Sequence, residues 1–222
     1  MRVRRLLASL DAPDRYGLLL LMILAAVLLS GLVSTQPWGQ VAITALLGSL
    51  LLFALRTSRA SARLTRAALL LVAAALGLAL LAATSGTALT PTGAGRAAIV
   101  ALLAALPVVI GRRLLAFPEV NAATVSGALC IYLILGLLFA SVFALEADVA
   151  HVPFFASQST ATGIDYLYFS YITLTTVGYG DLVPRGSLAR MLAVTEALTG
   201  QLYLVTVVAV VVGRFHRRDR PG

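Results

Sequence analysis

The chain contains long, unbroken apolar runs, and these constrain its fold more than any other feature of the sequence. Where no water is available, backbone amides must be hydrogen-bonded within their own segment, and the runs lack the two-residue alternation of a membrane barrel strand. With 60% hydrophobic and 12% charged residues, the chain is also too apolar for a soluble core. The sequence therefore predicts an all-α membrane protein with six transmembrane helices, at residues 16–34, 40–55, 67–84, 97–111, 122–145 and 187–213.

The fourth run, residues 97–111, is the shortest of the six and contains Pro107. As a helix its apolar stretch spans only about 23 Å, against about 30 Å of hydrocarbon. The ends of this helix are therefore the hardest to place from sequence.

The basic residues alternate with the runs, and all 17 of them are arginines. Fourteen fall on one side of the predicted membrane, in the N-terminal arm, in the loops after the second and fourth runs, and after the sixth run. On the other side, the connections TQPWG and SGTALTPTGA carry no charge, and Trp38 is expected at the outer interface. By the positive-inside rule both termini are cytoplasmic. This placement argues against a nucleic-acid partner, and the arginine clusters could instead meet anionic lipid headgroups.

The runs divide the chain into a cytoplasmic arm (1–15), a four-helix scaffold (16–113), a C-terminal domain (114–213) and a cytoplasmic tail (214–222). The first run ends in GLVSTQ without a small-residue cleavage site, so it is expected to be a helix and not a signal peptide. Cys130 is the only cysteine, so no intrachain disulfide can form. Abundant alanine and the use of arginine in place of lysine indicate a bacterial source, and we expect a location in its plasma membrane.

Between the fifth and sixth runs the chain must return to the membrane face from which it left. The segment DYLYFSYITLT, residues 165–175, spans about 16 Å as a helix, which is roughly half the bilayer. We therefore predict a re-entrant helix that enters the membrane without crossing it. The preceding residues 146–164, which include Glu146, Asp148 and His151, are expected to form a polar outer loop.

The re-entrant helix is followed by TTVGYGD, residues 175–181. Extended backbone at membrane depth is tolerated only where protein shields it or where it lines water. Gly178 and Gly180 permit the mirror-image conformations that turn consecutive carbonyls to one side of a strand. In such a strand the carbonyl oxygens form a column that can bind a dehydrated cation, and the Thr176 hydroxyl lies at the lowest position of this column. A glycine-rich turn is the alternative, but a turn does not explain two threonines, a valine and an aromatic residue at this place.

The stretch YFSYITLTTVGYGDLVP resembles the pore of tetrameric potassium channels, in which the sequence Thr-Val-Gly-Tyr-Gly is the selectivity filter. The resemblance extends from the fifth run through the sixth, about 90 of the 222 residues. It implies a potassium-selective channel that conducts K+ passively, without enzymatic activity or a cofactor. The residues implied to hold K+ are Thr176, Val177, Gly178, Tyr179 and Gly180. Because one chain supplies one such loop, the resemblance also implies a homotetramer with a pore domain at residues 114–213.

The resemblance further implies residues that support the filter, namely Thr175, Asp181, Tyr168, Phe169 and Ile172. Asp181 would tether the filter to the pore helix. In some relatives a glutamate shares this task at the position of Ile172, so we expect the Tyr168 hydroxyl to be the partner here. A solvated carboxylate that attracts cations is an equally good interpretation of Asp181. The aromatic residues expected to form one cuff around the filter are Tyr168, Phe169, Tyr171 and Tyr179.

In the sixth run, the resemblance places a hinge at Gly200, with close helix packing as the alternative. The residues implied to face a water-filled cavity are Gln201, Leu204, Val208 and Val212, and those implied to form a constriction are Val212, Phe215 and His216. Glu196 is the only acid within the six runs, and intramembrane carboxylates are functional candidates by default. We expect it to bond the pore helix or a neighbouring subunit, with proton-sensitive gating as the alternative.

The first four runs occupy the position of a voltage sensor in six-helix channels. Such a sensor needs several cations within its fourth helix and acids in the partner helices. Here the fourth run has none, since Arg96 precedes it and Arg112 and Arg113 follow it. Strong voltage gating is therefore not expected. There are two alternatives. One is a voltage-gated channel with a degenerate sensor, and the other is a non-conducting scaffold or sensor built on the pore fold. The sequence does not indicate the gating stimulus or whether His151 senses pH.

Overall fold

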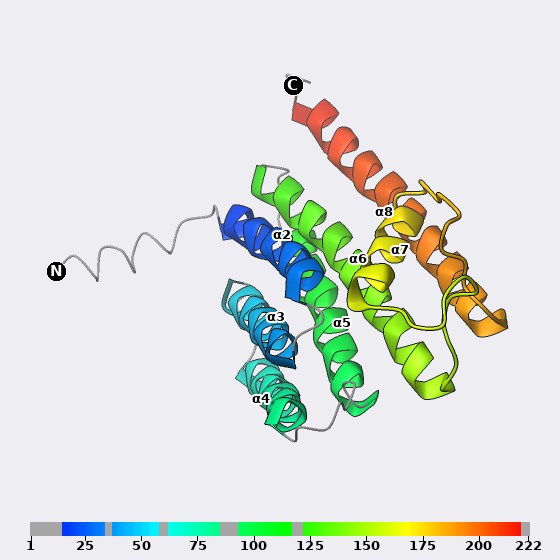
Figure 1. Ribbon diagram of the computed structural model, residues 1–222. Coiled ribbons are helices and arrows are strands. Elements are labelled where there is room, and N and C mark those ends of the chain that lie inside the picture. Colours follow the sequence, from blue (N-terminus) through cyan, green and yellow to red (C-terminus); the bar gives the residue numbers. More distant parts are fainter. Residues whose placement is uncertain (1–14, 34–36, 58–61, 85–92, 117–121, 219–222) are drawn as a thin grey trace.

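The computed structural model describes residues 15–33, 37–57, 62–84, 93–116 and 122–218, which form seven α-helices (Figure 1). The helices are α2 (Arg15–Val33), α3 (Pro37–Thr57), α4 (Ala62–Thr84), α5 (Gly93–Ala116), α6 (Ala122–Ala150), α7 (Gly163–Leu174) and α8 (Ser187–Arg218). Six of them follow the six apolar runs, and α7 is the short helix expected before the glycine-rich loop.

The other helices are arranged around α6. On one side α6 packs against α2 and α5, and α3 and α4 complete a four-helix group, the scaffold. On the other side α6 packs against α7 and α8, and these three helices form the C-terminal unit. Within the described part of the chain, α8 contacts α6 and α7 but not the scaffold, and its red C-terminal half projects beyond the other helices in Figure 1. The helix α6 is therefore a wall shared by the scaffold and the C-terminal unit, and α2 also contacts α7 directly.

The two groups of helices have cores of different chemistry. The scaffold buries aliphatic side chains in its core, among them Leu19, Ile23, Leu50, Leu102 and Leu106, and Ile134 of α6 belongs to the same cluster. The core of the C-terminal unit is aromatic, with Phe143, Phe154, Phe155 and Phe169 in mutual contact. Aromatic rings bury large areas and fix one another in tilted or edge-on pairs. The C-terminal unit is thereby given a rigid centre.

Three of the described helices are long and apolar enough to cross a membrane, namely Ala62–Leu81 in α4, Gly93–Arg112 in α5 and Thr124–Ala150 in α6. The segments Gly17–Leu29 and Val41–Arg56 are apolar but shorter. The described helices are thus those of a membrane protein, which agrees with the prediction of an all-α membrane fold.

Several helices extend beyond the apolar runs from which they were predicted. The helix α5 is continuous over 24 residues, about 36 Å, and includes Pro107. A proline removes one backbone hydrogen bond, a loss that packed neighbouring helices can accommodate in membrane proteins. The helix α8 reaches Arg218, so the predicted tail at residues 214–222 begins inside a helix.

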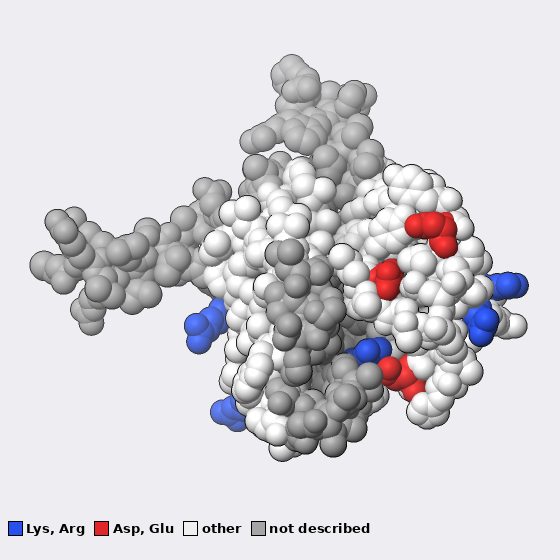
Figure 2. All heavy atoms as spheres, in the orientation of Figure 1, with Lys and Arg blue, Asp and Glu red and all other residues white. Residues whose placement is uncertain are grey.

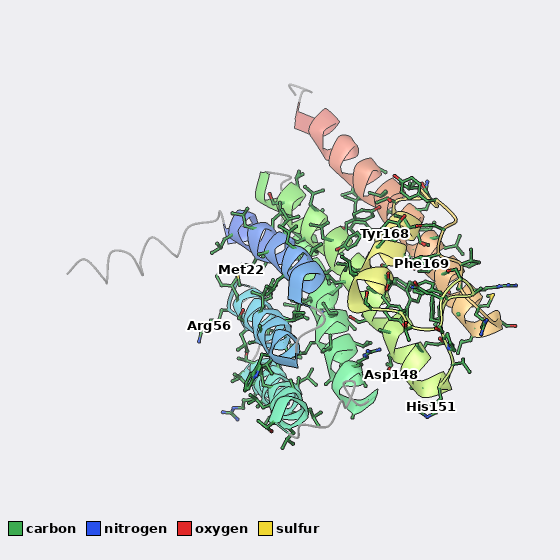
Figure 3. The ribbon with its side chains drawn as sticks, in the orientation of Figure 1. Met22, Arg56, Asp148, His151, Tyr168 and Phe169 are labelled. Carbon is green, nitrogen blue, oxygen red and sulfur yellow. The ribbon has the colours of Figure 1, made fainter. Side chains whose placement is uncertain are left out.

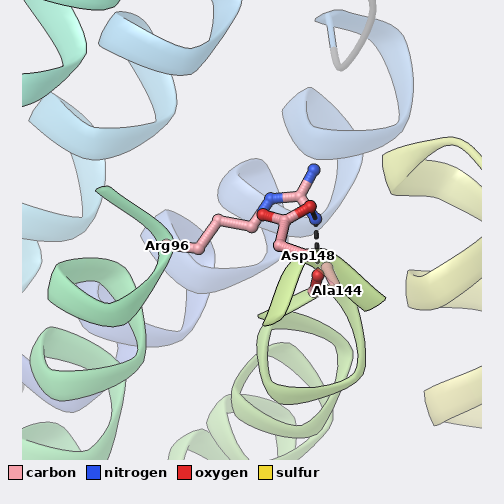
Figure 4. A network of polar contacts seen from close by, with 3 residues as sticks. All are labelled: Arg96, Ala144 and Asp148. Carbon is pink, nitrogen blue, oxygen red and sulfur yellow. Dashed lines mark hydrogen bonds and ion pairs between the residues drawn. The ribbon is translucent and has the colours of Figure 1, made fainter. Parts of the chain in front are cut away.

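The prediction that residues 146–164 form a loop is wrong at both ends, because α6 continues to Ala150 and α7 begins at Gly163. Glu146 and Asp148 therefore lie on the last turns of a helix. Arg96, on the first turn of α5, explains the extension (Figure 4). Its Nη1 lies 3.0 Å from Oδ1 of Asp148 and donates a hydrogen bond of 2.6 Å to the carbonyl of Ala144. A cation from the scaffold thus satisfies groups at the C-terminal end of α6, where cations are favoured.

Charged side chains are sparse on the described surface, and in Figure 2 the acidic ones lie on the half formed by the C-terminal unit. The described acids all belong to α6, α7, α8 or the segments between them: Glu146, Asp148, Asp165, Asp181 and Glu196. The described residues of the scaffold therefore contain no acid that could hold a row of moving cations.

Candidate functional site

The short helix α7 begins at a polar cap. The Asp165 carboxylate accepts hydrogen bonds from the backbone N–H and from the hydroxyl of Thr162, at 2.6 and 2.7 Å. A carboxylate in the first turn also interacts favourably with the positive end of the helix. With 12 residues, α7 is about 18 Å long, so it can enter a bilayer but cannot span it.

Side-chain hydroxyls fix α7 against α6. Tyr171 donates to the carbonyl of Leu133 at 2.7 Å, and Tyr132 on α6 donates to the carbonyl of Leu174 at 3.1 Å. Close approach of the two helices depends on Gly136, since a Cβ there would lie 2.5 Å from a ring carbon of Tyr171. The helix α6 thus provides much of the surface that positions α7, and α8 and α2 also contact it.

The backbone of α7 directs the loop that follows it. The N–H groups of Val177 and Gly178 both donate to the carbonyl of Ile172, at 2.9 and 3.1 Å. The backbone N–H and the hydroxyl of Thr175 both donate to the carbonyl of Tyr171. Ile172 thus accepts hydrogen bonds from two residues of the loop, whereas Thr175 bonds within the C-terminal end of α7.

Every second residue of the loop has a positive φ angle: 60° at Thr176, 54° at Gly178 and 80° at Gly180. Glycine adopts such angles at little cost, whereas a threonine at this angle is held there by its surroundings. Because residues of opposite hand alternate, the rotation between successive peptide planes is largely cancelled, and neighbouring carbonyls can face one side. The loop thus has the backbone alternation expected from Gly178 and Gly180, with Thr176 as a further member that sequence reasoning did not identify.

Tyr168 joins α7 to the far end of the loop (Figure 3). Its hydroxyl donates a hydrogen bond of 2.8 Å to Oδ2 of Asp181, the contact expected from sequence. Its ring also stacks on Tyr179, with centroids 6.4 Å apart and planes only 4° from parallel. One side chain of α7 therefore contacts two residues at the outer end of the loop.

The four aromatic residues expected to form one cuff have separate roles. Only Tyr168 and Tyr179 lie against each other. Phe169 packs against Phe143 in the aromatic core, and Tyr171 faces α6. Neighbouring positions on a helix point to different faces, so residues 168, 169 and 171 reach different partners.

Sequence reasoning missed Phe154 and Phe155, which hold the chain that leaves the loop. The N–H of Arg185 donates to the carbonyl of Phe154 at 2.6 Å, and Phe155 and Pro184 form an antiparallel bridge. Both rings are fully buried in the aromatic core. The sequence does indicate these residues, because the apolar stretch VPFF interrupts a segment that is otherwise polar.

The inner helix α8 crosses the end of α7 at Gly200. This glycine is buried, and a Cβ there would lie 2.6 Å from Cδ1 and 3.0 Å from the carbonyl oxygen of Leu174. Gln201 and Leu204 are exposed in the single chain. The side chains of Val208, Val212, Phe215 and His216 lie outside the described residues, so their expected roles stay predictions.

Glu196 is fully buried in α8, and its Oε1 is hydrogen-bonded to the hydroxyl of Ser170 on α7. The structure thus places the expected contact with the short helix within one chain. His151, by contrast, is exposed just after α6 (Figure 3). It lies beside an open pocket of about 270 Å³ that Asp148 and Tyr166 also line.

The arrangement can present a row of backbone oxygens to a cation. Residues 175–181 are exposed in the single chain, including half of the Val177 surface and 72% of that of Tyr179. Side chains exposed along α8 include Leu188, Met191, Val194, Leu198, Leu202 and Val205. The single chain thus leaves an apolar helix face exposed, as well as the loop.

Comparison with known proteins matches this part of the chain. Residues 127–217, which contain α7, the loop and most of α6 and α8, match the family described as Ion channel. The inward rectifier potassium channel Kirbac3.1 of Paramagnetospirillum magnetotacticum is 34% identical over 87 residues, which are 39% of this chain and 28% of that protein. Two-pore potassium channel 4 of Arabidopsis thaliana is 34% identical over 90 residues, 39% of this chain and 31% of that protein.

Protein LctB of Geobacillus stearothermophilus is 36% identical over 86 residues, 36% of this chain and 63% of that protein. The chain thus spans less than a third of the length of the first two relatives. No solved structure matches the chain.

Proposed function

We propose that the protein is a homotetrameric channel that conducts K+ passively across a membrane. The match of residues 127–217 to the family described as Ion channel, and their similarity to proteins named potassium channels, support this proposal. Residues 176–180 line the selectivity filter, where backbone carbonyls and the Thr176 hydroxyl replace the hydration shell of the ion. The family is one of channels and not of enzymes, and the proposed conduction needs no cofactor.

The observation that carries this proposal is the alternation of positive φ angles at Thr176, Gly178 and Gly180. An ordinary turn needs one or two residues of this kind, and it does not need them at every second position. A strand that presents consecutive carbonyls to an ion needs a positive φ angle at every second position. The carbonyl of Ile172 and the side chain of Tyr168 hold the two ends of this strand.

Four chains are needed because one chain contributes one strand to a ring of oxygens. The exposure of the loop and of the apolar face of α8 supports this assembly. In a tetramer these surfaces would face the central axis or a neighbouring subunit.

The proposed topology has six transmembrane helices, with α7 as a re-entrant pore helix and both termini in the cytoplasm. The described helix lengths support it, since α2, α3 and α8 contain 19, 21 and 32 residues and span about 28 Å or more. The arginines support the orientation by the positive-inside rule, and they also suit contact with anionic lipid headgroups. We place the channel in the plasma membrane of a bacterium.

Gating by voltage is proposed to be weak. Moving one charge through a potential of 100 mV is worth about 2.3 kcal/mol, so a sensor needs several movable charges. The described part of α5 carries Arg96 at one end and Arg112 towards the other, and Arg96 is paired with Asp148 on α6. Voltage steps over a wide range on the reconstituted channel separate this proposal from a voltage-gated channel with a degenerate sensor.

The proposal is tested by K+ flux into liposomes that contain the purified protein. We expect flux that barium blocks and that Gly178→Ala abolishes, because alanine at a φ of 54° disturbs the filter strand. Gly186→Ala is the matched control, since Gly186 has a φ of 82° and equally open surroundings but lies outside the filter.

Equal loss of flux in both variants would show that backbone strain alone is responsible. Folded tetramers that never conduct K+ would contradict the proposal and favour a scaffold built on the pore fold. A protein that stays monomeric in the bilayer would contradict it as well.

A further inference from the structure

Three helices of the C-terminal unit meet at one buried hydroxyl. The Oγ of Ser170 on α7 lies 2.7 Å from the carbonyl oxygen of Gly136 on α6, and it also contacts Oε1 of Glu196 on α8. Ser170 and Glu196 are both fully buried. We call Gly136, Ser170 and Glu196 the three-helix latch.

The latch needs more protons than the serine can supply. A hydroxyl carries one proton and can donate to only one of its two neighbours at a time. The Gly136 carbonyl can only accept, so if Ser170 donates to it, the contact with Glu196 requires a proton on the carboxyl. With an ionised Glu196, two acceptors would compete for one proton. Both contacts are hydrogen bonds at the same time only if Glu196 is an acid that donates to Ser170.

The surroundings of Glu196 also suit a neutral group. The titratable side chains that face it are Tyr132 from α6 and Tyr171 from α7, and both phenols already donate to the backbone carbonyls of Leu174 and Leu133. No cation among the described residues forms an ion pair with Glu196. Its Oε2 is buried without a hydrogen-bond partner. Leaving a charged oxygen unpaired in such a place costs far more than leaving the carbonyl oxygen of a neutral acid unpaired.

We propose that Glu196 is a positioning residue that acts as a neutral carboxylic acid and holds the pore helix α7 between the outer helix α6 and the inner helix α8. The inference deepens the proposed function, on which its consequence for K+ conduction rests. In the latch, the Glu196 proton goes to Ser170 and the Ser170 proton goes to Gly136, so all three helices are joined through one chain of hydrogen bonds.

Alkaline conditions would release this latch. When Glu196 loses its proton, the Ser170 hydroxyl turns to donate to the new carboxylate. The Gly136 carbonyl then loses the hydrogen bond from Ser170. The pore helix then loses one of its side-chain hydrogen bonds to α6, and α7 carries the filter directly through the carbonyl of Ile172. K+ conduction is therefore expected to fall as Glu196 ionises.

The protonation state is tested by infrared spectroscopy of the full-length protein in membranes at neutral pH. We expect the difference between wild type and Glu196→Gln to contain the carbonyl stretching band of a protonated carboxyl group. Carboxylate bands in its place would overturn the proposal. Glutamine fits the same space, is neutral and can donate from its amide to Ser170, so this variant is expected to fold.

The latch is tested by the pH dependence of K+ flux. Wild type is expected to lose flux severalfold between neutral and alkaline buffer, whereas Glu196→Gln keeps its flux over the same range. The matched control is Glu146→Gln, because Glu146 also has a buried oxygen without a partner but lies outside the latch. This control should keep the wild-type pH profile, and parallel profiles for wild type and Glu196→Gln would overturn the proposal.

Failure of the latch and failure of the proposed function give different results. The infrared band does not depend on conduction, so a protonated Glu196 in a tetramer that does not conduct K+ would contradict the proposed function alone. Flux with a carboxylate band would contradict the latch alone.

Discussion

At the scale of single residues, the C-terminal unit depends on places where a side chain would not fit. At Gly136 the helix α6 passes against the ring of Tyr171, whose hydroxyl is held by the carbonyl of Leu133. A flexible aliphatic neighbour could move away from an added methyl group, but a rigid ring whose hydroxyl is held in place cannot do so as easily. The same stretch of α6 also provides the carbonyl to which Ser170 is bonded.

We predict that Gly136→Ala lowers the free energy of unfolding by about 1–3 kcal/mol, the usual cost of overpacking. Thermal unfolding of the purified protein in detergent measures the change. Gly77→Ala in α4 is the control, since a Cβ there meets nothing within 4 Å and alanine favours helix more than glycine. Similar losses of stability in the two variants would mean that contact with Tyr171 is not the cause.

At the scale of helices, the orientation of α8 against α7 depends on contact between Gly200 and Leu174. Leu174 is fully buried, and its carbonyl accepts the hydrogen bond from Tyr132 on α6. Close packing and a hinge, the two expectations for Gly200, therefore predict different behaviour when Leu174 is shortened.

If packing dominates, Gly200→Ala destabilises the protein and Leu174→Ala partly compensates for it. The carbonyl of Leu174 would still lie 3.0 Å from the added Cβ, so the rescue is expected to be incomplete. A double-mutant cycle on unfolding midpoints should give a coupling of about 0.5–3 kcal/mol. The distant pair Gly77→Ala and Leu174→Ala provides an additive reference. Additive effects for Gly200 and Leu174, together with altered gating in Gly200→Ala, would support a hinge.

At the scale of the whole molecule, α6 connects the scaffold to the C-terminal unit, and Arg96 connects α5 to the end of α6. Both side chains of the Arg96–Asp148 pair are about four-fifths buried, at 20% and 21% exposure. A pair shielded to this extent is less weakened by water and salt than an exposed one. Its removal leaves the Asp148 carboxylate without its cation and takes the Arg96 donor away from the Ala144 carbonyl.

Arg96→Gln is therefore expected to destabilise the contact between α5 and α6 by about 1–3 kcal/mol, and Asp148→Asn by less because an amide oxygen still accepts. Amide hydrogen exchange should be faster at the ends of both helices in Arg96→Gln. The exposed residue Arg63 on α4 supplies the control, and Arg63→Gln should leave exchange unchanged. Unaltered protection of α5 and α6 in Arg96→Gln would contradict a role of the pair in joining the two groups of helices.

Much of the fold could be predicted because it is local in sequence. Long apolar runs become helices, and a segment too short to cross the membrane becomes α7. The helix ends could not be predicted in the same way. Glu146 and Asp148 look like loop residues until Arg96, about 50 positions earlier in the chain, is seen to neutralise Asp148.

The candidate site shows the same division. Gly178 and Gly180 indicate their own backbone conformation, because glycine is the residue that adopts positive φ at little cost. Thr176 gives no such indication, and its φ of 60° follows from its place in the alternating strand. The three-helix latch could be predicted only in part, since the sequence identifies Glu196 as a buried acid but does not show that Ser170 and Gly136 face it.

The way the scaffold meets the C-terminal unit has a consequence for how chains of this architecture could diversify. The helix α6 contacts α2 and α5 as well as α7 and α8, and α2 also contacts α7 directly. Among the described helices, α3 and α4 contact only other scaffold helices. These two could therefore be exchanged by evolution, or by a designer of chimeric proteins, without altering a direct contact of α7 or α8, whereas α2 and α5 would have to keep the surfaces that face α6 and α7.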